Sequence, residues 1–248
     1  MKIGIITAMP EETQAVVRAL GGTKKKLAGR LSVQQGRLAG HEIVIVEAGM
    51  GFYNAATAAE NLVREARPDM IISAGFCGGI KAGLLVGDAV LATGLLKVSE
   101  ERLQEVPVTI AAAGREFAAR QAAEGTRVFG GLFATTATIM QKSRLAALLP
   151  PDVPFPVVEM ESSAIAVVAA ENGIPFVGLR TVSDPFDEEL GFSLDEFCDD
   201  RMRIRIPRVL LTIVRKPRII PQLIRLARNS RVAAASLSHA MERLLAVL

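Results

Sequence analysis

Three acidic residues, Glu12, Glu161 and Asp184, lie directly after predicted strands. In open α/β sheets, ligands bind at the carboxyl ends of the strands, so we expect these side chains to meet at one site. Carboxyl groups in different environments can divide the roles of general acid and general base between them. Each also has a structural explanation, because acids are favoured in the first turn of a helix and Asp favours turns.

Other residues at the same strand ends could contact a ligand. They are Met9, Met50, Gly51, 75–79, 138–140, Met160 and Ser183. The stretch 49–54 lacks the last glycine of the dinucleotide fingerprint, and the sequence contains no Walker pattern. His41 and His239, with two distant cysteines, give neither zinc-ligand spacing nor a plausible Ser–His–Asp triad. We therefore expect no metal and no nucleotide cofactor of these classes.

The composition is that of a folded intracellular protein. The chain has 248 residues, of which 50% are hydrophobic and 22% are charged, so disorder is excluded. Cys77 and Cys198 cannot form the disulfide framework of a small secreted protein. The N-terminus is too acidic for a signal peptide, and no apolar run reaches the roughly 18 residues that span a membrane. We expect a cytoplasmic protein that is soluble or at most peripheral to the membrane.

The positive charge is concentrated in one segment. Residues 201–231 contain nine Arg and one Lys without Asp or Glu, and they alternate with Ile, Leu and Val. This pattern fits a basic helical extension packed on the domain, a surface that contacts anionic membranes, or a nucleic-acid surface. Nucleic acid is the least favoured of the three, because the segment lacks aromatic residues for base stacking.

The order of predicted elements is that of an α/β protein. Expected strands cover 2–7, 31–37, 42–47, 69–74, 88–93, 128–136, 157–160 and 174–182. Expected helices cover 10–21, 52–66, 109–124, 161–171, a segment beginning at 193, and 232–247. We predict a turn at 75–79, and short pieces divided by Pro207, Pro217 and Pro221 before the last helix. Without a repeat or a low-complexity linker, 1–248 is expected to form a single domain.

Five segments together resemble the bacterial methylthioadenosine/S-adenosylhomocysteine nucleosidases of the nucleoside phosphorylase superfamily. They read MKIGIITAMPEE, PDMIISAGFCGG, VGDAVLAT, VVEMESSAIAVVAAENGIPFVGLRTVSD and FSLDEF, and they cover roughly 1–93 and 128–198. The run EMES with a downstream SD is typical of the superfamily, and MPEE points to its hydrolytic branch. The resemblance implies a three-layer α/β/α sandwich with a mixed central sheet.

The resemblance also implies cleavage of the N-glycosidic bond of a purine nucleoside. Asp184 matches the general acid that donates a proton toward N7, and Ser183 orients its carboxyl group. Glu12 matches the base that polarises the attacking water, while Glu161 and Met160 match the pair that holds the ribose hydroxyls. We expect Asp184 to be desolvated and protonated, and Glu12 to stay ionised at its helix N-terminus. The substrate site would be completed by Met9, Met50, Gly51, Phe76, Ile139 and Leu194, among which Met9, Met50, Ile139 and Leu194 line the base and 5′ pockets.

The sequence departs from the family pattern in three places. Phe76-Cys77 replaces a small Ser-Ala pair and would place a ring beside the ribose. The loop between about 94 and 127, which in the family carries acidic and His residues near the 5′ end of the substrate, is short. The basic segment 201–231 is longer than a nucleosidase requires. A bulkier 5′ group explains these departures, even a lipid-linked adenosine presented at a membrane, as in the related branch that acts on adenosylhopane.

Two alternatives to hydrolysis remain open. A phosphorylase of the same fold could use Arg30 or Arg180 as phosphate ligands, although Glu12 would then face the phosphate dianion. A non-catalytic module that binds nucleosides or a lipid surface is the second alternative. By resemblance, we expect a homodimer whose interface includes the apolar helix at 52–66.

Overall fold

The computed structural model describes residues 1–29, 31–99, 102–138, 140–187, 212 and 215–248. The strands of its first half are β1 (Lys2–Thr7), β2 (Lys24–Ala28), β3 (Leu31–Leu38), β4 (His41–Glu47) and β5 (Met70–Gly79). Those of its second half are β6 (Ala89–Ser99), β7 (Arg102–Glu105), β8 (Val128–Thr136), β9 (Val157–Glu159) and β10 (Phe176–Asp184). The helices are α1 (Pro10–Ala19), α2 (Phe52–Ala66), α3 (Ala112–Ala123), α4 (Lys142–Leu148), α5 (Ser162–Glu171) and α7 (Ile220–Leu245), with a 3-10 helix at Pro217–Ile219.

The described strands form one mixed sheet. Its order is β10-β6-β8-β9-β5-β1-β4-β3-β2, with β7 paired to β6. β10 also pairs with β5, so β5, β10, β6, β8 and β9 close into a ring while β1 to β4 extend from it. Parallel pairing of β1 with β4 and β5 brings the carboxyl ends of these strands to the same edge, as we predicted for the site.

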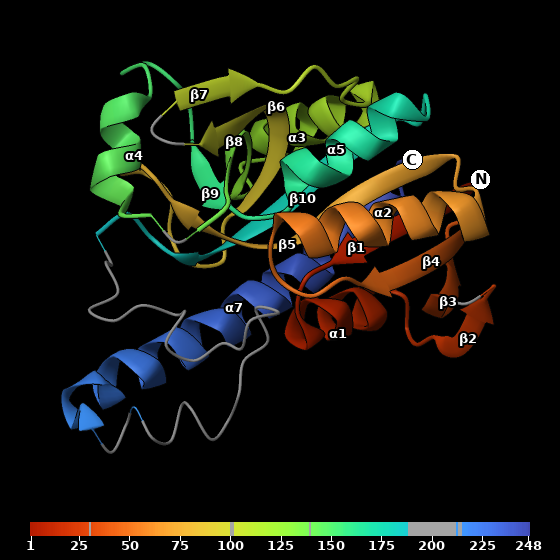
Figure 1. The fold of residues 1–248 in the computed structure, drawn as a ribbon, viewed down its shortest axis with the longest axis horizontal. Helices are drawn as coiled ribbons and strands as arrows, with labels where there is room; N and C mark the ends of the chain where they lie inside the picture. Colours follow the sequence, from red (N-terminus) through yellow and green to blue (C-terminus); the bar gives the residue numbers. More distant parts are fainter. Residues whose placement is uncertain (30, 100–101, 139, 188–211, 213–214) are drawn as a thin grey trace.

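Helices cover both faces of the sheet. Figure 1 shows α2 and α5 on one side and α1 and α7 on the other. Successive side chains of β4 alternate between the two layers: Ile43 and Ile45 belong to the core with α1, α3 and α7, and Val44 and Val46 to the core with α2 and α5. This alternation follows from the two-residue repeat of a strand. The predicted three-layer α/β/α sandwich with a mixed sheet is confirmed.

The glycine-rich segment after residue 74 is strand, so our prediction of a turn there was wrong. β5 runs on to residue 79 and is buried along its whole length. A Cβ at Gly75 would lie 2.3 Å from Nη1 of Arg180 and 2.5 Å from Oε1 of Glu12. A Cβ at Gly78 would lie 2.6 Å from Oδ2 of Asp184. The glycines therefore leave space for charged side chains that lie directly against the strand.

The C-terminal helix also differs from the prediction. α7 is one long helix, whereas we predicted short pieces before a helix at 232–247. Pro221 lies in its first turn, where the missing N–H costs no hydrogen bond, so it does not break the helix. Pro217 begins the 3-10 helix. Pro207 and the helix predicted from 193 lie outside the described residues.

Several other elements carried no clear sequence signal. β6 continues well past the predicted strand at 88–93 and forms a hairpin with β7, which occupies the segment that we expected to be a short loop. β2 and α4 were not predicted either. β2 is exposed on nearly every residue, and α4 has only seven, so neither shows the regular apolar pattern that identifies an element.

We predict that Gly131→Ala in β8 destabilises the fold. A Cβ there would lie 2.3 Å from the carbonyl oxygen of Phe155 and 2.6 Å from Cγ1 of Val90, closer than van der Waals contact. The free energy of unfolding, measured by urea denaturation, should fall by about 1–3 kcal/mol. Gly114→Ala in α3 is the control, because its nearest atom is at 3.4 Å and alanine favours helix. Equal losses in both variants would contradict the prediction.

Candidate active site

Glu12 lies near the start of α1 and is held by backbone N–H groups from two elements. Its Oε2 accepts hydrogen bonds from the N–H of Ala8 (2.8 Å) and of Met9 (3.0 Å), so it does cap the helix. Its Oε1 accepts a third hydrogen bond from the N–H of Phe76 on β5 (2.8 Å). β1 pairs with β5 only as far as Ser73, so Glu12 takes an N–H beyond the end of that pairing.

Glu161 joins the beginnings of two helices. It is the N-cap residue of α5, and its Oε1 accepts a hydrogen bond from the N–H of Gly51 at 2.8 Å. Gly51 is the N-cap residue of α2 and has a φ of 94°, a conformation that glycine adopts readily. The N-termini of helices favour negative charge. The turn before α2 therefore positions this carboxyl group.

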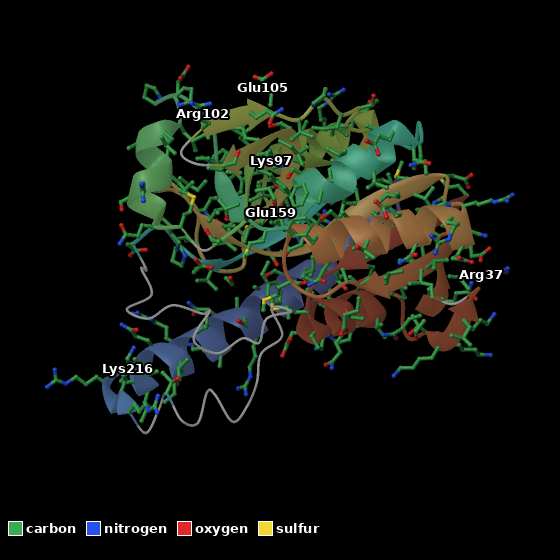
Figure 2. All side chains as sticks on the ribbon, in the orientation of Figure 1. Arg37, Lys97, Arg102, Glu105, Glu159 and Lys216 are labelled. Atoms are coloured by element: carbon green, nitrogen blue, oxygen red, sulfur yellow. The ribbon has the colours of Figure 1, made fainter. Side chains whose placement is uncertain are left out.

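Arg180 lies in the middle of β10 and is 1% exposed. Its Nη2 donates to Oε2 of Glu159 at 2.5 Å and lies 3.4 Å from Oε2 of Glu161. The same nitrogen donates to the hydroxyls of Ser73 (3.2 Å) and Ser162 (3.0 Å). Glu159 is itself 5% exposed, and it is labelled near the middle of the view in Figure 2. Such partners are required, because an unpaired charge in a protein interior is strongly unfavourable.

The carboxyl groups around Arg180 outnumber its single positive charge. Burial raises the pKa of Glu161 to about 7. The nearby carboxylates of Glu159 and Glu12 also raise this pKa, whereas the charge of Arg180 lowers it. Burial by itself would raise the pKa of Glu159. Arg180, together with hydrogen bonds from Thr135 and from two backbone N–H groups, outweighs burial and lowers this pKa. Glu159 is therefore the constant counter-ion of Arg180. Glu161, by contrast, exchanges a proton near neutral pH.

Burial acts on Glu12 in addition to the helix N-terminus that we expected to keep this carboxylate ionised. Burial raises the pKa of Glu12, and it outweighs the opposing effects of Arg180 and of the three backbone N–H groups. The side chain is 2% exposed, so little water remains to solvate its charge. A carboxylate with a raised pKa is a better proton acceptor.

Asp184 ends β10, where a bulge at Ser183 shifts the pairing with β5. The hydroxyl of Ser183 lies 2.8 Å from Oδ1 of Asp184 and donates to it. The ammonium group of Lys142 lies 2.7 Å from Oδ2. Burial raises the pKa of Asp184, while Lys142 and Ser183 oppose it. The direction agrees with our expectation of a desolvated Asp184.

β5 relates the three predicted carboxyl groups to one another. Glu12 lies against Gly75, and Asp184 lies against Gly78. Three residues of extended strand span about 10 Å along the chain. Glu161 is close enough to Glu12 for each charge to affect the other. The structure therefore groups Glu12 with Glu161 and places Asp184 a short way along the same strand.

Two predicted contact residues act through their backbone. Met9 and Phe76 supply N–H groups that hold Glu12. The ring of Phe76 is buried in the core that includes residues of α1 and α7. We predicted this ring beside the ribose, but alternation along β5 turns it into the core, and its N–H is the group that reaches Glu12.

Of the four remaining predicted contact residues, the structure describes two. Met50 lies half-buried in the turn before α2, where its carbonyl oxygen accepts a hydrogen bond from Asn54 at 2.8 Å. Met160 lies half-buried between β9 and α5, next to Glu161. Ile139 and Leu194 lie outside the described residues. The structure thus positions the methionines near the carboxyl groups, and the other two apolar residues stay predictions.

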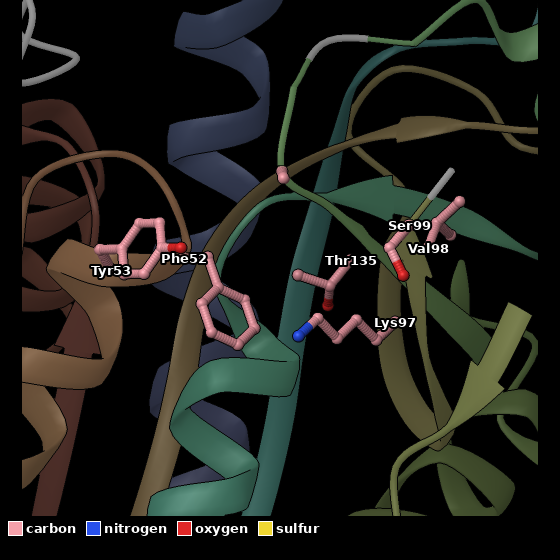
Figure 3. A pocket seen from close by; sticks show the side chains of 7 residues that line it. Phe52, Tyr53, Lys97, Val98, Ser99 and Thr135 are labelled. Atoms are coloured by element: carbon pink, nitrogen blue, oxygen red, sulfur yellow. The ribbon is translucent and has the colours of Figure 1, made fainter. Parts of the chain in front are cut away.

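A pocket is lined in part by Thr135, the hydrogen-bond partner of Glu159 (Figure 3). It lies between the start of α2 and strands β6 and β8, and it is lined by Phe52, Tyr53, Lys97, Val98, Ser99, Thr135 and Ala137. The Nζ atom of Lys97 lies 4.5 Å from the centroid of the Phe52 ring, a cation–π distance. Thr135 also donates a hydrogen bond to Glu159. The pocket therefore has an apolar wall and one positive charge, and Thr135 connects it to Glu159.

Sequence reasoning did not assign Glu159 or Lys142, and it gave Arg180 only as a possible phosphate ligand. Arg180 had a signal, since it is the one charged residue of the apolar strand predicted at 174–182 and must have partners there. Glu159 belongs to the EMES run. Lys142 had none, because α4 itself was not predicted. Within the described part of the chain, no group of three or more His, Cys, Asp and Glu side chains could hold a metal ion.

Solved structures share this fold. The chain matches the 5′-methylthioadenosine/S-adenosylhomocysteine nucleosidase of Neisseria meningitidis, in complex with methylthio-immucillin-A, with a TM-score of 0.73 and 25% identity. That match covers 100% of this chain and 99% of the other. The futalosine hydrolase of Helicobacter pylori matches with a TM-score of 0.75 over 100% of this chain and 98% of the other, but at 15% identity it shows the fold alone.

Sequence comparisons identify the family. A sequence model of the phosphorylase superfamily matches residues 2–215. The 5′-methylthioadenosine/S-adenosylhomocysteine nucleosidase of Actinobacillus succinogenes is 32% identical over 213 residues, which cover 79% of this chain and 91% of that relative. The corresponding protein of Bacillus thuringiensis is 30% identical over 219 residues, 80% of this chain and 92% of the relative. This chain therefore belongs to the phosphorylase superfamily and, within it, to the 5′-methylthioadenosine/S-adenosylhomocysteine nucleosidases.

Proposed function

We propose that this protein hydrolyses the N-glycosidic bond of a 5′-substituted adenosine and releases adenine. One observation carries the proposal: Glu12 and Glu161 are buried around Arg180, and Asp184 lies a short way along β5. The names of the curated relatives, 5′-methylthioadenosine/S-adenosylhomocysteine nucleosidases, agree with this activity.

The charge of the site suits the sugar in the transition state. As the bond to the purine breaks, positive charge develops on the sugar. Glu12, Glu159 and Glu161 surround the single guanidinium of Arg180, so the site is net negative when they are ionised. Fixed negative charge stabilises such a transition state more than it stabilises the neutral substrate. Three backbone N–H groups hold Glu12 in place, so it needs no reorganisation during the reaction.

Two carboxyl groups divide the proton transfers. Glu12 is the base that polarises the attacking water, and its raised pKa suits this role. Asp184 is the acid that donates its proton to N7, so that adenine leaves as a neutral molecule. Burial raises the pKa of Asp184 and so favours the protonated form that the step requires. Ser183 fixes the orientation of the carboxyl group through Oδ1.

Glu161 binds the sugar. Its Oε1 accepts the N–H of Gly51, and its remaining acceptor capacity is available to the ribose hydroxyls. Met160 precedes it and supplies an apolar contact to the sugar. Because the pKa of Glu161 is about 7, the ionised acceptor form predominates above neutral pH.

The arrangement favours hydrolysis over phosphorolysis. A phosphate dianion at Arg180 would meet Glu12, Glu159 and Glu161, and like charges at this range repel by several kcal/mol at intermediate dielectric. Arg180 is already bound to two carboxylates and two hydroxyls. Arg30, the other phosphate ligand that we considered, lies outside the described residues.

The 5′ substituent determines which adenosine is the substrate. Relatives are named for 5′-methylthioadenosine and S-adenosylhomocysteine, and we propose these as the substrates. A lipid-linked adenosine is the second candidate, and the exposed basic and apolar surface of α7 favours it. For both substrates we place the 5′ group near the pocket at Phe52 and Lys97, which Thr135 connects to Glu159.

The function predicts adenine release that does not depend on phosphate. In phosphate-free buffer, chromatography should detect adenine formed from 5′-methylthioadenosine or S-adenosylhomocysteine, at the rate measured with phosphate. Asp184→Asn should lower kcat by about 10²–10⁴-fold with little change in binding, because it removes the proton donor. Asp152→Asn, at an exposed loop position, is the control and should keep full activity.

Two results would overturn the function. A strict requirement for phosphate would identify a phosphorylase. Binding of either nucleoside without any turnover would identify the non-catalytic module.

We also propose a cytoplasmic homodimer. The thiol of Cys77 is buried and free, which agrees with a reducing compartment. Tyr53 on α2 is 85% exposed, and Val167 on the adjacent α5 is 38% exposed. Tyrosine is enriched in protein interfaces, so a second copy could cover this surface.

The dimer predicts a mass of twice 26.4 kDa in sedimentation equilibrium. Tyr53→Glu should shift the mass toward that of one chain, because it places a charge in the interface. Leu85→Glu is the control, since Leu85 is also exposed, at 58%, and lies in the segment between β5 and β6. A wild-type mass of a single chain at micromolar concentration would refute the dimer.

We propose further that the first turns of α7 contact anionic membranes. Residues 212–231 contain five Arg and one Lys without an acidic residue. Ile224 is 65% exposed and Ile220 is 40% exposed, between exposed Arg218, Arg225 and Arg228. Lys216 extends away from the protein at this end (Figure 2). No described helix is long and apolar enough to cross a bilayer, so the contact is at the surface.

Vesicle flotation tests this contact. The protein should float with phosphatidylglycerol vesicles, float less with phosphatidylcholine, and dissociate at high salt. Ile224→Glu combined with Arg228→Glu should reduce the bound fraction about tenfold or more. Leu27→Glu, at a position 75% exposed on β2, is the control and should bind normally. Equal recovery of all three proteins would end the membrane proposal.

A further inference from the structure

Lys142 is a buried cation beside the end of β10, the strand that carries the proposed acid. It is the first residue of α4 and is 6% exposed. Its Nζ atom lies 2.7 Å from Oδ2 of Asp184 and donates to the backbone oxygens of Asp184 (3.0 Å) and Pro185 (2.7 Å). Lysine is almost never buried without a charged partner. The contacts of Lys142 therefore converge on the end of β10.

The pair is built into β5. A Cβ at Gly78 would lie 2.6 Å from Oδ2 of Asp184 and 3.1 Å from Cε of Lys142. Both side chains therefore lie directly against the strand at Gly78, because only glycine leaves space for them there. Ser183 holds the other carboxyl oxygen, Oδ1, at 2.8 Å. Each oxygen of the proposed acid thus has its own donor.

We propose that Lys142 is a positioning residue for the reaction, which fixes the Asp184 carboxyl group and sets the pH range in which this group carries the proton. The inference rests on the proposed function, because it assumes that Asp184 is the acid. Lys142 touches Asp184 and the backbone, so its effect on the purine is indirect.

The chemistry explains why a cation is useful there. The proton leaves Asp184 and bonds to N7 as the bond between the purine and the sugar breaks, and the electron pair of that bond stays with adenine. Asp184 becomes a carboxylate, and the ammonium group at 2.7 Å stabilises it. Without Lys142, burial alone would make the group a weaker acid that holds its proton more tightly.

Other groups face the same region and stay unchanged in the test. Ser183 lies on β10 beside Asp184, and the buried thiol of Cys77 lies on β5. The charges of Arg180 on β10 and Glu159 on β9 affect the pKa of the Cys77 thiol. The charges of Asp184 and Lys142 affect it too. Because Arg180 is paired with Glu159, Lys142 is the described positive charge that contacts the Asp184 carboxyl group directly.

Lys142→Met tests the proposal through the pH profile of kcat/KM. The acid works only when protonated, so activity declines as pH rises through the pKa of Asp184. Removal of the cation should move this alkaline limb upward by about one to three pH units. The value of kcat below the limb should fall about tenfold, while KM changes little. Lys142→Arg keeps the charge and should keep the wild-type limb.

A second measurement does not depend on turnover. The carboxyl ¹³C signal of Asp184, assigned by its loss in Asp184→Asn, should titrate at higher pH in Lys142→Met than in the wild type. An upward shift supports the role of Lys142 even if the wild type releases no adenine, an outcome that would refute the function alone. The inference would be overturned if Asp184 titrated at the same pH in Lys142→Met and in the wild type, and the alkaline limb of kcat/KM did not move.

A purely structural role would give a different result. If Lys142→Met and Lys142→Gln both fail to fold while Lys142→Arg folds, the lysine serves the fold and the inference is wrong. A uniform loss of kcat at every pH, without movement of the limb, would lead to the same conclusion.

Discussion

The buried guanidinium of Arg180 is the interaction on which the site depends. A charge in the middle of an apolar strand is tolerated only where the surrounding elements supply counter-charges and hydrogen bonds. Here β9 supplies Glu159, the start of α5 supplies Glu161 and Ser162, and β5 supplies Ser73. The elements that satisfy this one group are the elements that enclose the site, so the requirement of the fold and the requirement of the chemistry are met by the same contacts.

An excess of carboxyl groups over this cation gives the site its chemical character. Glu159 remains ionised as the partner of Arg180, and burial raises the pKa values of Glu161 and Glu12. The result is a buried region in which carboxyl groups outnumber the single cation, with the carboxyl group of Asp184 against the same strand, β5. A neutral nucleoside can enter such a region, and it becomes attractive as the sugar gains positive charge. An anionic co-substrate is disfavoured by the same charges.

Most of the fold could be predicted from the sequence, because strands such as 2–7 and 128–136 carry continuous apolar runs and α1 and α2 have clear helical boundaries. The predicted turn at 75–79 failed for a physical reason: its glycines make room for Arg180, Glu12 and Asp184, and a sequence pattern cannot distinguish this from the flexibility of a turn. The carboxyl groups could be found because they follow strands. Lys142 could not, since its partner lies 42 residues away and its own helix is short.

β5 has a consequence for how this protein could be altered. Glu12 and Asp184, which come from α1 and β10, both lie against this one strand, at Gly75 and Gly78. A residue larger than glycine at either position would displace the carboxyl group beside it. Loop exchange can change what surrounds the site, whereas a laboratory redesign has to keep these two glycines.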